Sequence, residues 1–130
     1  MELLIAFGTD DGRNLKRDHV GKSKYFYVYR FSYDEEEFVE RRKNVKYKED
    51  ESMIHGDPGK AKATSTVLKG LDVVVGRRFG PNLLRLLKKY VCIVARRETI
   101  NDAIQLIHAN MDKVIQEKEK GENRRYLIFS

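Results

Sequence analysis

Residues 71–76 read Leu-Asp-Val-Val-Val-Gly, and their pattern indicates the fold class. After Asp72 the run has no polar face, which is typical of a parallel strand that is covered on both sides. Residues 91–95 (Val-Cys-Ile-Val-Ala) and 3–7 (Leu-Leu-Ile-Ala-Phe) are similarly apolar. These runs predict an α/β protein whose parallel strands are buried between helices.

Residues 25–47 predict a hairpin next to the first strand. Residues 25–32 alternate between two faces, and one face carries four aromatic side chains, which we expect to pack beneath helices: Tyr25, Tyr27, Tyr29 and Phe31. A polar turn follows at 34–37, and residues 38–47 predict a polar strand at the sheet edge.

Three helices are predicted in the second half of the chain. Asp57 is an N-cap followed by proline, and Pro81 opens a short helix. Thr99 is the N-cap of a long helix whose apolar positions recur as far as Ile115. The element order β-β-β-α-β-α-β-α predicts a mixed five-stranded sheet with helices on both faces. The fold occupies residues 1–120, and residues 121–130 form a tail or an extra short strand.

Length and composition exclude several classes of protein. A chain of 130 residues corresponds to one domain, and no apolar run approaches the roughly 20 residues of a membrane span. The N-terminus has no basic region of a secretory signal, so we expect a cytoplasmic protein. The single cysteine, Cys92, excludes an intramolecular disulfide and a cluster caged by this chain's thiolates. The charged fraction of 35% is of the kind found in thermophilic proteins.

The net charge of +6 is scattered along the chain. No block of five like positive charges occurs, and acidic runs at 34–37 and 49–51 offset the basic pairs. This distribution argues against a nucleic-acid ligand, although a binding domain for nucleic acid or a small anion stays open as the alternative function.

Three segments are expected to meet beyond the carboxyl ends of the parallel strands, where ligands bind in open α/β sheets. They are residues 8–24, 55–59 and 76–82. Two histidines, His19 and His55, lie in these loops close to glycines, so a ligand could approach each imidazole closely. The plainer interpretation is that each is a surface residue.

Residues 76–82 (Gly-Arg-Arg-Phe-Gly-Pro-Asn) join a buried strand to a helix N-terminus. Arg77 and Arg78, together with the helix dipole, would suit a compact anion. The alternative is a tight turn with two solvated arginines. The glycine spacing matches neither a phosphate-binding P-loop nor a dinucleotide-binding motif.

The remaining reactive side chains favour structural roles. His108 lies on the apolar stripe of the long helix and predicts a histidine at the edge of the core. Cys92, inside a buried strand, is expected to be inert. Asp10 and Asp11 follow the carboxyl end of one strand, whereas Asp72 starts another, so the carboxylates of a metal nuclease would lie at opposite edges. The sequence shows no recognisable Ser/His/Asp or Cys/His set for nucleophilic catalysis, and we expect the protein not to be an enzyme.

Several segments together resemble the dinitrogenase iron–molybdenum cofactor biosynthesis family. Residues 18–26 (Asp-His-Val-Gly-Lys-Ser-Lys-Tyr-Phe) are similar to its His-Phe-Gly-Arg-Ala-Pro-Tyr-Phe segment, and His55-Gly56 with residues 70–76 is similar to its His-Gly … Gly-Val-Asp-Val-Val-Ile. Gly80-Pro81-Asn82 and residues 91–104 also follow the family's order. The resemblance covers residues 3 to about 115.

The resemblance implies a ribonuclease H-like fold without nuclease activity and a carrier role for an anionic iron–sulfur-type cluster, such as the iron–molybdenum cofactor or its precursor. It also implies a protein that donates or accepts the cluster. His19 and His55 would contact the cluster metal. The wider set of cluster-binding positions is His19, Gly21, His55, Gly56, Gly76, Arg77, Arg78, Gly80 and Asn82. Arg77 and Arg78 replace the small residues usual in that loop.

Overall fold

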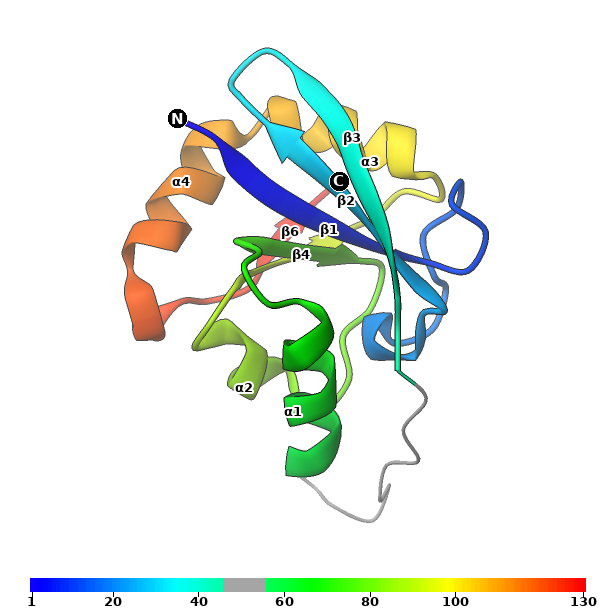
Figure 1. Ribbon diagram of the computed structural model, residues 1–130. Helices are drawn as coiled ribbons and strands as arrows, with labels where there is room; N and C mark the ends of the chain where they lie inside the picture. Colours follow the sequence, from blue (N-terminus) through cyan, green and yellow to red (C-terminus); the bar gives the residue numbers. More distant parts are fainter. Residues whose placement is uncertain (46–55) are drawn as a thin grey trace.

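The computed structural model describes residues 1–45 and 56–130, and its centre is one six-stranded mixed sheet with the order β3-β2-β1-β4-β5-β6 (Figure 1). Strand β1 lies centrally, as predicted, with the hairpin on one side and the parallel strands on the other. The strands span Leu3–Thr9 (β1), Tyr25–Phe31 (β2), Glu36–Lys43 (β3), Val73–Gly76 (β4), Val91–Ala95 (β5) and Leu127–Phe129 (β6).

The parallel part of the sheet runs from β1 through β4 and β5 to β6, whereas β2 and β3 pair in antiparallel fashion. The five-stranded prediction is wrong by one strand, because residues 127–129 pair with 93–95 of β5. The three residues of β6 are too few to show a periodic pattern, and only Phe129 among them is buried. Pairing of their backbone with β5 therefore decides their conformation.

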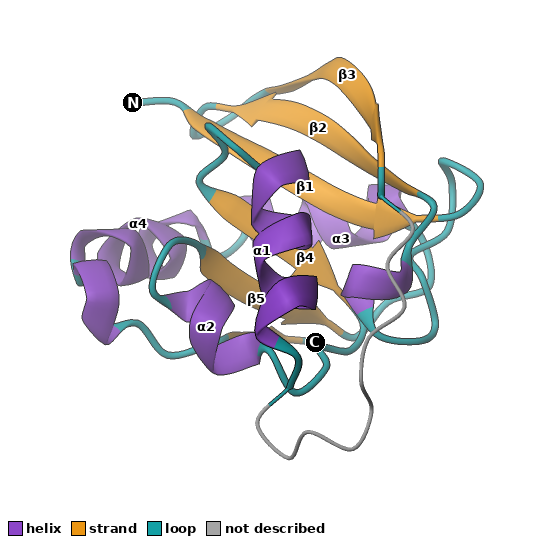
Figure 2. Ribbon diagram, turned by 60° about the horizontal axis from the view of Figure 1, so that its bottom comes forward, coloured by secondary structure: helices purple, strands orange, loops and turns teal. Residues whose placement is uncertain are grey.

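Helices cover both faces of the sheet, as predicted. One core places α1 and α2 against Ala6, Val74 and Cys92, and the other packs α3 and α4 against the opposite face. Figure 2 shows α1 and α2 in front of the sheet and α3 behind it. The helices span Pro58–Val67 (α1), Leu83–Leu87 (α2), Ile100–His108 (α3) and Met111–Glu119 (α4), with 3-10 turns at Val20–Lys22 (η1) and Gly121–Asn123 (η2).

The prediction of one long third helix is wrong, because the helix is interrupted between His108 and Met111. Asn110 leaves the helical conformation (φ −129°, ψ 22°), and its side-chain amide donates to the Leu106 carbonyl at 2.8 Å. Asparagine competes in this way for backbone groups that would otherwise continue a helix. Both α3 and α4 bury residues in the same core, so the apolar periodicity conceals the break. The N-cap prediction is confirmed, since Thr99 Oγ1 accepts from the Asp102 amide at 3.1 Å.

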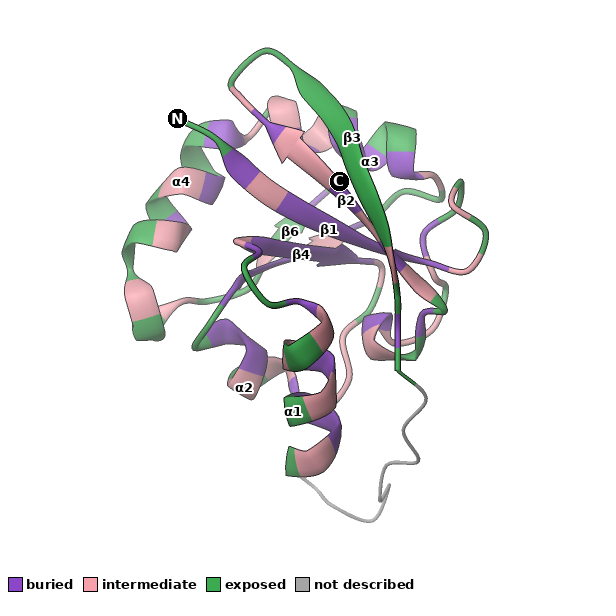
Figure 3. Ribbon diagram, in the orientation of Figure 1, coloured by how far each residue is buried: buried purple, intermediate pink, exposed green. Residues whose placement is uncertain are grey.

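Strand β3 lies at the sheet edge and is exposed along nearly its whole length (Figure 3). The prediction of a polar strand at the sheet edge is therefore confirmed, but its bounds differ. The predicted strand covers 38–47, whereas β3 begins at Glu36 and ends at Lys43. Tyr47 lies outside the described residues. Three of the four aromatic residues on this face of β2 pack inward as expected, with Tyr27 and Tyr29 against the core and Phe31 fully buried. Tyr25 does not, because it is partly exposed and the Arg41 guanidinium lies over its ring. His108 sits at the rim of that core, with its ring 4.8 Å from the Phe31 ring.

Candidate functional site

Three loops meet at the carboxyl ends of the parallel strands. The Leu15 amide donates to Glu98 O at 2.8 Å, which ties the loop after β1 to the loop after β5. The Val20 amide donates to Arg78 O at 2.9 Å, which ties the same loop to the one after β4. The sequence predicts that the loops after β1 and β4 meet, and this backbone hydrogen bond joins them directly.

The 3-10 turn η1 rests on the sheet edge through Val20, which is 1% exposed. Its side chain occupies space that only glycines leave free: a β-carbon on Gly8 would lie 2.5 Å from Val20 Cγ2, and one on Gly76 would lie 2.7 Å from Val20 Cβ. Gly76, a predicted cluster contact, is therefore a packing position beneath the turn, and its strand segment is fully buried.

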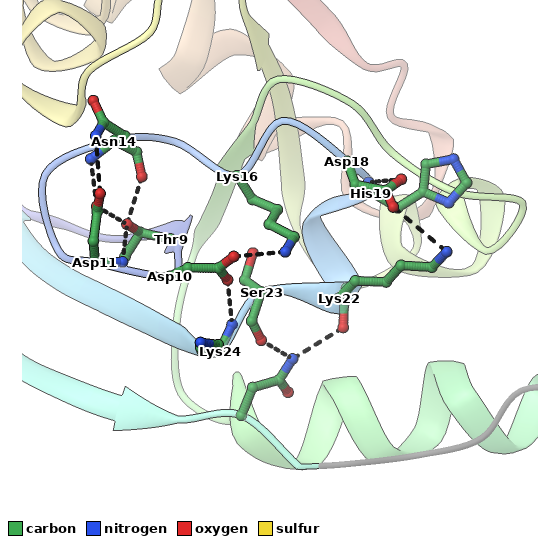
Figure 4. Close-up of polar contacts among 12 residues, drawn as sticks. Thr9, Asp10, Asp11, Asn14, Lys16, Asp18, His19, Lys22, Ser23 and Lys24 are labelled. Carbon is green, nitrogen blue, oxygen red and sulfur yellow. Dashed lines mark hydrogen bonds and ion pairs between the residues drawn. The ribbon is translucent and has the colours of Figure 1, made fainter.

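His19 directly precedes this turn, and its ring lies against Gly80, whose β-carbon would be 2.9 Å from His19 Nδ1. The residue is half-buried, and its side chain has no hydrogen-bond partner among residues 1–45 and 56–130. Figure 4 shows the imidazole pointing away from the Asp10–Lys16 ion pair. A ring nitrogen of His19 is thus available to a ligand.

A groove runs beside the ring, between η1, the first turns of α1 and the loop after β4; we call it the His19 groove. Lys60 and Thr64 of α1 close one side, and both are buried. Gly21 lies opposite Lys60, and a β-carbon there would be 3.5 Å from Lys60 Cε, an ordinary contact distance. Its lining includes His19, Gly21, Lys22, Lys60, Thr64, Phe79, Gly80 and Asn82.

Lys60 and Thr64 were missed by the sequence interpretation. The sequence does contain a pattern that places them together: Lys60, Thr64 and Leu68 follow one another at four-residue spacing and therefore share one face of a helix. The predicted start of that helix is confirmed: Asp57 Oδ1 accepts from the Gly59 amide at 2.8 Å, and Pro58 follows the cap.

Asn82 and Gly56 hold the entrance to α1. The side-chain amide of Asn82 donates to Asp57 O at 3.0 Å, while its Oδ1 accepts from Arg85 at 2.8 Å. Gly56 has φ +82°, and a β-carbon there would lie 2.4 Å from Asn82 Oδ1. Both predicted contacts therefore have structural partners within the chain. His55 lies outside the described residues.

The loop 76–82 does not act as one anion site. Helix α2 has five residues, and the Leu83 amide at its start already donates to Gly80 O at 3.1 Å. Arg78 is exposed, and its backbone pairs with His19. Arg77 lines a different space, so the structure does not bring it to the His19 groove.

Arg77 borders an open cavity of about 600 Å³ beyond the loop after β1. The lining carries four carboxylates and three cationic side chains, so its net charge does not favour the binding of an anion. The lining consists of Asp10, Asp11, Asn14, Leu15, Lys16, Arg17, Asp18, Arg77 and Glu98.

The two aspartates of this loop shape it through internal bonds (Figure 4). Asp10 accepts from Lys16 Nζ at 2.6 Å and from the Lys24 amide at 2.9 Å. The backbone amides of Asn14 and Arg13 donate to Asp11 and hold the pKa of that carboxyl well below its usual range. Both carboxylates are engaged in forming the turn.

Asp72 lies at the opposite end of the sheet, as predicted. Its Oδ2 accepts from the Leu4 amide at 2.8 Å, and its Oδ1 pairs with Lys118 Nζ at 3.1 Å. Within the described part of the chain, no group of three or more histidine, cysteine or acidic side chains is placed to hold a metal ion. The carboxylates thus do not form the paired centre of a metal nuclease.

Cys92 is fully buried in β5, and burial raises the pKa of its thiol to about 12. Because the side chain has no exposed surface, a ligand at the protein surface does not reach its sulfur in the folded protein. The predicted inert role fits this environment.

Comparison with known proteins identifies the family of this chain. The family model described as dinitrogenase iron-molybdenum cofactor matches residues 1–110. The chain belongs to the dinitrogenase iron-molybdenum cofactor family. The resemblance of its loops to that family is therefore confirmed, and the family connects the chain with processes that involve the iron-molybdenum cofactor.

The fold of this family member is found in a crystal structure from Methanocaldococcus jannaschii, described as that of a "putative dinitrogenase". The TM-score is 0.57 at 17% sequence identity, over 85% of this chain and 91% of the other. A search of curated proteins finds no match. Among the helices of the described residues, none has the length and apolar character needed to cross a bilayer.

Proposed function

We propose that this family member is a non-enzymatic binding protein that carries an anionic iron–sulfur-type cluster, the iron-molybdenum cofactor or a precursor, as its cargo. The main support for this proposal is the position of His19. Its ring lies against Gly80 at the rim of a groove that Lys60 also lines. The His19 side chain makes no hydrogen bond to another of the described residues. Imidazole is a good ligand for iron, and a lysine beside it suits an anionic cargo.

A carrier must release what it binds, so few protein ligands are an advantage. The buried Cys92 cannot contribute a thiolate, which leaves histidine and positive charge to hold the cluster. We propose His19 and His55 as metal contacts and Lys60 and Lys22 as the charges facing the cargo. We also propose that the fold is a ribonuclease H-like scaffold without a nuclease centre, that this protein is cytoplasmic, and that another protein donates or accepts the cluster.

The test is cluster binding under anaerobic conditions. The purified protein is mixed with a synthetic or extracted iron–sulfur cluster, and the visible absorbance is followed in the wild type and in His19→Gln. We expect the variant to bind at least about tenfold more weakly. The matched control is His108→Gln, because this histidine lies at the rim of the other core.

Two results would count against the proposal. If the double variant His19→Gln/His55→Gln kept the wild-type affinity, the assigned site would be wrong. If the wild-type protein bound no cluster, and metal analysis after anaerobic purification found neither iron nor molybdenum, the carrier function itself would fail.

The charge requirement is tested separately on α1. Lys60→Met removes the buried ammonium from the His19 groove, whereas Lys62→Met removes an exposed ammonium two residues further along the same helix. We expect only the first change to weaken cluster binding. Equal affinities in the two variants would assign the cargo to another surface.

A further inference from the structure

The outer edge of β3 is unpaired within the described residues, and its charges are segregated along the strand. The first two residues, Glu36 and Glu37, are acidic, and the last three, 41–43, are basic. Charged residues on an edge strand usually prevent pairing with another sheet. A strand with one acidic and one basic end, however, is complementary to an antiparallel copy of itself.

We propose that β3 pairs with β3 of a second copy of this chain in antiparallel fashion, which joins the two sheets into one. The two-fold axis would pass between Val39 and Glu40. In this register Glu36 lies opposite Lys43 of the second copy, and Glu37 lies opposite Arg42. Each opposite-charge pair occurs twice because the contact is symmetric.

A β-bulge makes this register possible. Tyr29 pairs with Phe38 and Val28 pairs with Glu40, so Val39 is the extra residue of β3. In consequence Phe38, which contacts the Tyr27 and Tyr29 rings, lies on the same face as Arg41, whose guanidinium stacks on Tyr25.

Residues three apart lie on opposite faces of a regular strand. With the bulge, the proposed partners Phe38 and Arg41 lie on the same face, and so do Glu36 and Lys43. A second copy can therefore place each charge beside its opposite on the same side of the joined sheet. In a regular strand the same pairs would point to opposite sides.

The centre of β3 carries the exposed apolar side chains that such a contact would cover. Phe38 is 51% exposed and Val39 is 36% exposed. In the proposed register Phe38 lies opposite Arg41 of the second copy, and both residues are on the same face of the joined sheet. A shift of the register by two residues would instead place Glu37 opposite Glu40. The opposite shift would place Arg42 opposite Val39 and Lys43 opposite Phe38, which leaves both cations without an opposite charge. The charges therefore favour the first register, with the apolar residues in the middle and the charges at the rim.

The test exchanges one pair of charges. Wild-type protein is examined by analytical ultracentrifugation up to about 1 mM, since a single pair of edge strands gives a small and weak interface. We expect a monomer–dimer equilibrium that weakens with salt. Glu36→Lys and Lys43→Glu should each raise the dimer dissociation constant at least about tenfold, because like charges then face each other. An equimolar mixture of the two variants should restore dimerisation, since each charge again meets its opposite.

Lys62→Glu on the exposed face of α1 is the control, because it changes the net charge as Lys43→Glu does. Circular dichroism of each variant checks that the fold is kept, as Glu36 also contacts His108 Nε2 at 2.9 Å. A wild-type protein that stays monomeric throughout the range would overturn the proposal. So would variants that dimerise as the wild type does, or a mixture that fails to associate.

Discussion

His19 and Gly80 are in direct contact: the Nδ1 atom of the imidazole lies 2.9 Å from the place that a β-carbon of Gly80 would take. The backbone holds the two residues in this relation, because the Val20 amide donates to Arg78 O at 2.9 Å between them. The position of the candidate ligand thus depends on a glycine in another loop.

Gly80→Ala should disturb the ring without removing it. A methyl group at 2.9 Å from Nδ1 is closer than real contacts allow, so the imidazole must turn away. Changes that misorient a metal ligand typically cost 10- to 100-fold in affinity, and we expect about tenfold weaker cluster binding here. Absorbance titration under anaerobic conditions measures the loss.

Gly21→Ala is the matched control within the same groove. Its new β-carbon would lie 3.5 Å from Lys60 Cε, an ordinary van der Waals distance, so the free energy of unfolding should change by less than about 0.5 kcal/mol. If Gly80→Ala bound the cluster as Gly21→Ala does, the orientation of His19 would have no part in binding.

Gly8→Ala and Gly76→Ala should both lower the free energy of unfolding, because each β-carbon meets Val20. Overpacking of this kind costs about 1–3 kcal/mol, measured by chemical denaturation. The two clashes differ in their partner atoms: Gly8 meets Val20 Cγ2 at 2.5 Å, whereas Gly76 meets Val20 Cβ at 2.7 Å. Val20→Ala removes the Cγ2 contact at both positions, but Ser23 Oγ stays 2.6 Å from a β-carbon on Gly8 and Val20 Cβ stays 2.7 Å from one on Gly76. A double-mutant cycle should therefore show partial relief at both positions. If Val20→Ala gave no relief at either position, this packing would be contradicted.

Cys92 should react only when the protein unfolds. The thiol is fully buried and its pKa is raised to about 12, so alkylation by iodoacetamide should be very slow in the native state and fast in denaturant. Mass spectrometry follows the modification. Cys92→Ala should leave cluster affinity unchanged while it destabilises the fold by about 1 kcal/mol. A loss of cluster binding in this folded variant would show that the thiol has access to the cargo.

The strands of the parallel sheet could be predicted from the sequence because each is marked by a pattern within its own residues. The run at 71–76 lacks a polar face, and Asp57 with Pro58 marks a helix start. The break at Asn110 was not readable, since α3 and α4 bury apolar residues in one core and preserve the period of a single helix. Strand β6 has three residues, which is too short to show alternation.

The candidate site was readable in part. Sequence order predicts that the loops after β1 and β4 meet, but not which side of the sheet edge each side chain takes. Arg77 lies with the carboxylates beyond the β1 loop, whereas Gly80, three residues later, lines the His19 groove. That division arises from the pairing of His19 and Val20 with Arg78, a contact between loops that no single segment encodes.

The C-terminal strand is held in place by a buried carboxylate on α4. Glu117 is 7% exposed and accepts hydrogen bonds from Lys120 Nζ at 2.5 Å and from the Arg125 amide at 3.1 Å. Burial alone would raise the pKa of Glu117, but these two bonds, together with the positive charges of Lys120 and Arg125, outweigh it and hold the pKa below its usual value. The carboxylate form therefore stabilises the fold. This contribution is complete above the unfolded-state pKa of about 4.3 and is lost as the pH falls through the lower folded-state pKa.

Glu117→Gln should lower the free energy of unfolding at neutral pH by about 1–2 kcal/mol, because the charge-assisted bonds to Lys120 and to the Arg125 amide are weakened. As the pH falls through the lowered folded-state pKa of Glu117, the difference from the wild type should shrink, since the wild-type carboxyl then takes up a proton as well. Urea denaturation at several pH values measures both effects. Glu119→Gln, on the exposed side of the same helix, is the control and should show neither. A difference between Glu117→Gln and the wild type that stayed constant from neutral to acid pH would mean that the charge of Glu117 does not hold the segment leading to β6.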